Sequence, residues 1–165
     1  MTSEGTPAGP YLLRLDRVEP RLAALASTPP PTRMTDPDPS TGQRWEWGQV
    51  WAHLAEFVPY WLRQMEVVLA APGPAPAPFG RTKADEGRIA AIERDRRRPP
   101  SELWSRLHGH LSELRRALTD LRPEAWSRQG EHPTLGVMDL EAFVEEYLVG
   151  HLEQHAQQLD GMAAA

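Results

Sequence analysis

The sequence contains no cysteine and a single lysine, Lys83, among its 165 residues. The absence of cysteine excludes disulfides, thiolate metal ligands and a cysteine nucleophile. No apolar run reaches the length of about 18 residues that a membrane-spanning helix needs. The first ten residues lack the basic and apolar regions of a secretory signal peptide. We therefore predict a cytoplasmic protein that does not contact membranes.

Basic residues are fewer than acidic ones, 18 against 23, and the formal net charge is −5. Nucleic-acid-binding domains are usually basic, so we predict no nucleic-acid partner. The one concentrated basic run, residues 94–98, is typical of a solvated loop before a helix. Length and composition indicate one globular domain over residues 1–165, with a flexible segment over residues 1–10.

Proline and glycine divide the chain into four segments in which apolar residues recur at helical spacing. Pro20 predicts a kink or a split in the first segment, and Pro59 predicts a bend in the second. Ser101 is suited to cap the start of the third. We predict helices over residues 11–26, 45–70, 101–121 and 139–162.

The segments between these helices are long and rich in proline. Residues 72–80 predict a stiff extended connector, and the charged stretch from there to residue 98 is an arm, a lid or a surface loop. Residues 124–136 predict a polar loop. No alternating pattern of strand length is present, so β structure is expected to be minor or absent. We predict an all-α four-helix bundle, in which either an overhand or an up-down-up-down connection is possible.

Three of the six histidines fall on apolar stripes of these predicted helices. His151 and His155 are four residues apart and therefore share one helix face, and His53 lies in the second helix. A single buried histidine is most simply a hydrogen-bonded core residue. Three inward imidazoles, whose nitrogens all need partners, predict a shared metal ion. Three ligands leave coordination positions open, as in catalytic sites, and imidazole suits zinc, nickel, copper or iron(II).

Several other residues are candidates to lie next to this site. Glu56 and Glu153 are candidates to orient histidine ligands, although exposed helix glutamates are the commoner case. His108 and His110 are expected on the surface. Four tryptophans around His53 are expected to wall a pocket or, at least equally, to form an aromatic core: Trp45, Trp47, Trp51 and Trp61. The candidate pocket residues are Trp47, Trp51, Tyr147 and His132, the last of which lies in the GEHPTLG loop.

Several motifs together resemble the DinB-like (DinB/YfiT) superfamily. They are an early helix, the segment WEWGQVWAHLAEF, the late loop GEHPTLG, and a His-x-x-x-His pair followed by Gln-Leu. The resemblance implies a four-helix bundle, frequently a homodimer, with a divalent metal that is nickel, zinc or, less often, iron. It assigns the ligand roles to His53, His151 and His155. The superfamily includes mycothiol-dependent maleylpyruvate isomerase and bacillithiol S-transferases, which implies a low-molecular-weight thiol as a cosubstrate.

Three functional hypotheses follow. The first is an enzyme that uses an open three-histidine site to activate a thiol or water against a small electrophile, as a transferase, isomerase or hydrolase. The second is a non-catalytic, stress-associated bundle that binds a metal or a small molecule. The third is a metal-free bundle with an apolar pocket. The sequence identifies neither the substrate nor the metal.

Overall fold

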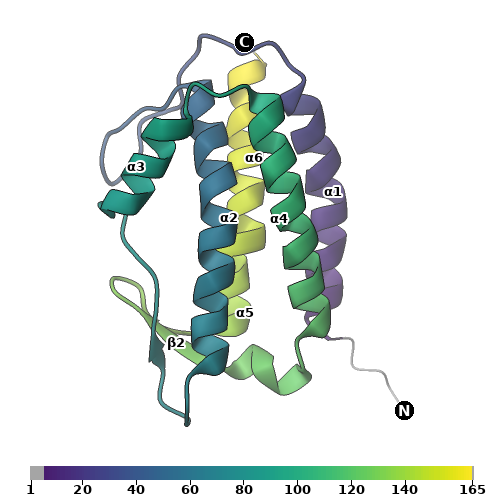
Figure 1. Ribbon diagram of the computed structural model, residues 1–165, viewed down its shortest axis with the longest axis vertical. Helices are drawn as coiled ribbons and strands as arrows, with labels where there is room; N and C mark the ends of the chain where they lie inside the picture. Colours follow the sequence, from purple (N-terminus) through teal and green to yellow (C-terminus); the bar gives the residue numbers. More distant parts are fainter. Residues whose placement is uncertain (1–5, 165) are drawn as a thin grey trace.

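The computed structural model describes residues 6–164 of the chain and confirms a four-helix bundle (Figure 1). Leucines and other apolar residues at helical spacing face inward from every long helix and form one continuous core. The last long helix is uninterrupted but contains a π-helical turn, η2. The long helices are α1 (Ala8–Ala26), α2 (Trp47–Ala70), α4 (Pro100–Asp120) and the last one, made of α5 (Leu140–Phe143), η2 (Val144–Val149) and α6 (Gly150–Ala163).

The bundle has an overhand connection. Helix α2 packs against α4 and α6, and α1 packs against the same two helices on the opposite side. Along the chain, α1 runs in one direction, α2 and α4 both run in the other, and the last helix returns (Figure 1). Because α2 and α4 are parallel, residues 71–99 must carry the chain back along the whole bundle. This long return places part of the crossover beside α2.

The helix ends differ modestly from the sequence prediction. Neither Pro20 nor Pro59 splits its helix, since α1 and α2 continue through both. Helix α1 begins at Ala8, whose side chain is buried in the core, so residues 8–10 of the segment predicted to be flexible are helical. Residues 1–5 of that segment lie outside the described part of the chain. No helix of residues 6–164 has the length and apolar character needed to span a membrane.

The crossover, residues 71–99, and the segment 121–139 both contain regular structure that local sequence patterns did not indicate. The crossover includes a charged helix, so this part of it is neither an arm nor a loop, and residues 121–139 form a short helix and a hairpin rather than only a polar loop. The strands are two to four residues long, too short to show alternation, and β1 depends on a partner distant in sequence. These elements are β1 (Ala77–Pro78), α3 (Glu86–Asp95), the 3-10 helix η1 (Pro123–Ser127), β2 (Gln129–His132) and β3 (Gly136–Asp139).

A three-stranded sheet in the order β1-β2-β3 lies at one end of the bundle (Figure 1). The proline-rich connector joins it through β1, where Ala77 pairs in parallel with Gly130, and through the Phe79 amide, which donates to the Glu131 carbonyl at 3.0 Å. A Cβ atom on Gly130 would lie 2.6 Å from the Phe79 ring, so only glycine permits this close approach. The connector is thus anchored to the hairpin.

Candidate metal centre

The three predicted ligand histidines meet between α2 and α6. The Nε2 atom of His151 lies 3.0 Å from Nε2 of His53 and 3.1 Å from Nε2 of His155. All three ligand atoms lie within 4.8 Å of one another. His53 is buried, with 4% of its surface exposed, whereas His151 and His155 are partly accessible. One side of the cluster therefore faces the core and the other can be reached from outside.

The hydrogen bonds around the cluster leave too few N–H protons for the three Nε2 atoms to hydrogen-bond with one another. Nδ1 of His53 lies 2.8 Å from a carboxylate oxygen of Glu56, and Nδ1 of His155 lies 2.9 Å from the amide oxygen of Gln158. Both oxygens are acceptors, so each Nδ1 donates and each neutral ring presents a bare lone pair at Nε2. His151 Nε2 carries at most one proton and cannot donate to both neighbours. At least one close nitrogen pair therefore lacks a hydrogen bond.

A shared cation fits this arrangement. Two nitrogens that are each about 2.0–2.1 Å from one ion lie about 2.9 Å apart at a ligand angle near about 90°, and about 3.4 Å apart at a tetrahedral angle. The observed separations of 3.0 and 3.1 Å lie in this interval. The residues present thus match a divalent ion held by three imidazoles, with room for further ligands.

Burial keeps these imidazoles in the form that binds metals. Burial, and next the neighbouring His155 and His151, hold the pKa of His53 well below its ordinary value. Burial likewise holds the pKa of His151 well below the ordinary value and lowers the pKa of His155 to about 4. All three rings are therefore neutral near pH 7. Neutral imidazole is the ligand form that metals require.

Side chains behind the histidines hold two of the three rings in place. The Glu56 carboxylate, only 8% exposed, contacts His53 and is also paired with the Arg81 guanidinium. Burial raises the pKa of Glu56, and the positive charge of Arg81 opposes that rise. Glu153, the other candidate orienting residue, instead forms an ion pair with Arg14 on α1. Glu56 is thus confirmed in contact with a ligand histidine, and Glu153 is not.

Two aromatic rings lie against the cluster: Trp45, which was predicted near His53, and Phe57, which was not predicted as a pocket residue. Phe57, fully buried in α2, packs on His151 with ring centroids 4.5 Å apart. Trp45, in the loop before α2, lies edge-on to His53 at 5.2 Å and parallel to His155 at 6.5 Å. Trp47 and Trp51 are buried in the core and pack on each other.

The remaining pocket candidates lie near the small sheet. Tyr147 is stacked on Trp61 with centroids 4.0 Å apart and lies 5.2 Å from the His132 ring. His132 Nε2 lies 3.0 Å from the Arg81 carbonyl oxygen, and its Nδ1 accepts from the amides of Thr134 and Leu135. Both ring nitrogens of His132 are therefore occupied: Nε2 joins the hairpin to the connector, and Nδ1 binds the turn of the hairpin itself.

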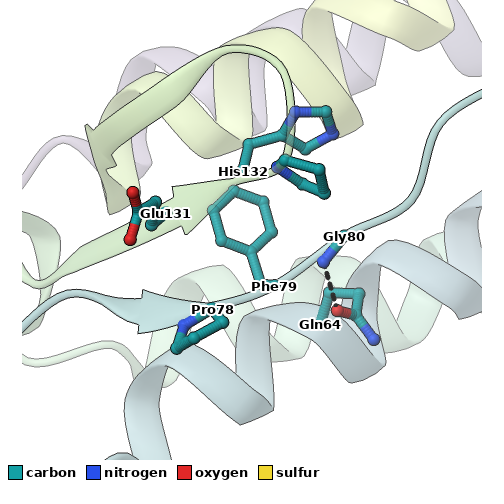
Figure 2. Close-up of a pocket in the computed structure, with 7 residues that line it drawn as sticks. Gln64, Pro78, Phe79, Gly80, Glu131 and His132 are labelled. Atoms are coloured by element: carbon teal, nitrogen blue, oxygen red, sulfur yellow. Dashed lines mark hydrogen bonds between the residues drawn. The ribbon is translucent and has the colours of Figure 1, made fainter.

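His132 also lines a surface pocket of about 430 Å³ that is separate from the histidine cluster. Figure 2 shows Phe79 at its centre, between α2 with Gln64 and the hairpin with Glu131 and His132. The amide of Gly80 donates to the Gln64 side chain at 2.7 Å, which closes one wall. None of the three ligand histidines lines this pocket.

The comparisons with known proteins bear on the fold. No family model and no curated protein matches the sequence. A solved structure does match, that of YfiT from Bacillus subtilis, described as a probable metal-dependent hydrolase with an unusual four-helix bundle topology. The TM-score is 0.72 at 19% identity, and the match covers 99% of this chain and 89% of that one. The predicted resemblance is thereby confirmed at the level of structure, and the chain has the DinB/YfiT-like four-helix-bundle fold.

Proposed function

We propose that the protein is a metal-dependent enzyme that holds one divalent ion through His53, His151 and His155. The observation that carries this proposal is the convergence of three neutral imidazoles with too few protons to satisfy one another. A bound divalent ion would supply Lewis acidity toward a carbonyl, or lower the pKa of a water or thiol ligand. The chemistry is then attack of water or a small thiol on a small electrophile.

The side chains around the cluster suit this role. Glu56 and Gln158 accept the Nδ1 protons and so direct the Nε2 lone pairs inward. Phe57 closes the core side against water, while partly accessible His151 and His155 leave the outer side open to a substrate. The description of YfiT as a probable metal-dependent hydrolase supports hydrolysis as the first reaction class to examine. Thiol transfer is the second.

The test is metal analysis of the full-length chain purified without a histidine tag. We expect one zinc or nickel ion per chain, and loss of stoichiometric binding in His155→Ala because two imidazoles remain. His110→Ala is the matched control, since His110 lies on α4 beside Glu113 and away from the cluster. A wild-type chain that takes up no divalent metal, even after metal is added, would contradict the proposal.

Activity assays distinguish the proposed enzyme from a non-catalytic metal-binding bundle. The loaded protein is assayed for hydrolysis of activated esters and amides, and for transfer of a low-molecular-weight thiol to a small electrophile. We expect metal-dependent turnover in one of these assays and none in His155→Ala. Metal binding that raises the melting temperature without any turnover would favour a bundle that the ion merely stabilises.

A further inference from the structure

One charged side chain near the histidines takes no part in holding them. Arg88 lies on α3, in the crossover, and its guanidinium carbon is 5.4 Å from the centre of the Trp45 ring. Trp45 in turn contacts both His53 and His155. The crossover thus brings a cation to the same indole that borders the histidine cluster.

Arg88 has no carboxylate partner, unlike the two cations that precede it in the crossover, Arg81 and Lys83. Arg81 is paired with Glu56, and Lys83 is 2.7 Å from Asp38. Within residues 6–164, no carboxylate oxygen lies within 4.0 Å of the Arg88 guanidinium, whose one protein acceptor is the Lys83 carbonyl at 3.1 Å. Burial lowers the pKa of Arg88, so its position carries a desolvation cost. A partly buried arginine of this kind retains free donors for an anion.

The three histidines that would bind the metal carry no negative charge. Three neutral imidazoles leave the full charge of a divalent ion uncompensated, and the nearest carboxylate, Glu56, is engaged by Arg81. A cation next to a metal centre weakens metal binding by repulsion, so Arg88 does not serve to hold the ion. It does strengthen the attraction of that face for an anion.

We propose that Arg88 binds the anionic group of the substrate, and that the substrate is a small carboxylate rather than a neutral molecule. This inference rests on the proposed function, because the histidine centre is the place where that substrate reacts. Arg88 is here a residue that selects the substrate class. The cation–π contact with Trp45 places the Arg88 guanidinium next to the ring that borders the cluster.

The test uses the untagged full-length chain loaded with Co²⁺, whose visible spectrum reports entry of a ligand at the metal. Acetate is the anionic probe and acetamide is the neutral control of the same shape. We expect Arg88→Gln to weaken acetate binding at least about tenfold, with Arg88→Lys intermediate and acetamide unaffected. Co²⁺ affinity should stay the same or rise in Arg88→Gln, because a repelling charge is removed.

Arg17→Gln is the matched control, since it removes the same charge from an exposed position on α1. Acetate binding that changes less than about twofold in Arg88→Gln would overturn the inference. A joint fall of acetate and Co²⁺ affinity would also overturn it, because that result assigns Arg88 a structural role. A wild-type chain that binds Co²⁺ but not acetate refutes this inference alone, whereas one that binds no Co²⁺ refutes the proposed function as well.

Discussion

Two of the three clustered histidines are each held by a side chain three residues further along the same helix. His53 is followed by Glu56 and His155 by Gln158, and in both cases an oxygen accepts the Nδ1 proton. Residues three apart are neighbours on a helix, so each pair forms within its own turn. The two supports differ in charge, since Glu56 is a carboxylic acid side chain and Gln158 is a neutral amide.

The role of Glu56 can be tested by Glu56→Gln. The amide can still accept from His53 but carries no charge, and it leaves the buried Arg81 guanidinium without its partner. We expect metal affinity to fall at least about tenfold, measured by competition with a chelator of known affinity. Glu153→Gln is the control, because Glu153 pairs with Arg14 instead. Equal effects of the two substitutions would contradict the assigned role of Glu56.

At the scale of single elements, the last helix is unusual in having a π-helical turn, Val144–Val149, just before the ligand His151. Such turns are rare and are found mostly at functional sites. The extra residue in this turn shifts the side chains that follow it around the helix axis. Gly150 ends the turn, and a Cβ atom there would lie 2.1 Å from the Glu145 carbonyl oxygen. The turn therefore needs glycine at this position.

Gly150→Ala should therefore destabilise the protein, by about 1–3 kcal/mol, because the added methyl group overpacks the turn. We expect a lower midpoint of urea unfolding and weaker metal binding, since His151 follows directly. Gly161→Ala on the same helix is the control. Nothing lies within 4 Å of its added Cβ, so alanine should be neutral or stabilise by up to about 1 kcal/mol. A Gly150→Ala protein as stable as wild type would show that the turn tolerates a side chain.

At the scale of the whole molecule, the course of the crossover determines which of its side chains lie near the three histidines. It is fastened at its sheet end by β1 and His132, and at its far end by Asp95. Asp95 is 2% exposed and accepts from three arginines, of which Arg106 belongs to α4. Gly48 allows the start of α2 to approach this end closely, since a Cβ there would lie 2.0 Å from the Arg96 carbonyl oxygen. These contacts hold α3, and so Arg88, against the bundle.

The ion pairs of Asp95 stabilise the fold in a pH-dependent way. Hydrogen bonds from Arg94, and next from Arg98, hold the pKa of Asp95 below its ordinary value. Because the folded-state pKa is the lower one, the ionised carboxylate stabilises the fold above about pH 4, and this contribution is lost as the pH falls further. We expect Asp95→Asn to cost about 1–2 kcal/mol at pH 7, since its partners remain largely solvated.

The measurement is urea unfolding from pH 7 to pH 3. The difference in stability between wild type and Asp95→Asn should shrink below about pH 4, because Asp95 of the unfolded chain takes up a proton there before Asp95 of the folded protein does. Asp120→Asn, at the exposed end of α4, is the control and should change stability by less than about 0.5 kcal/mol. A difference that does not vary with pH would contradict the role of the Asp95 charge.

Several features of the site were predictable because they are local. The apolar spacing predicts all four long helices, and the i,i+4 pair of His151 and His155 lies on one face whatever surrounds it. Glu56 follows from its spacing to His53. Gln158 has the same spacing to His155. These predictions hold because a helix relates residues three or four apart through its own geometry.

The sequence alone determined the four long helices, the absence of cysteine ligands and the identity of three candidate ligands. The tertiary structure decided which helices are neighbours, and it brought His53 against a residue 98 positions away in the chain. It also decided the course of the crossover, which takes Arg88 to Trp45, and the pairing of β1 with β2. The physical reason is the distance along the chain between the residues that interact. Hydrophobic periodicity depends on residues three or four positions apart, whereas these contacts depend on how segments far apart in sequence pack together.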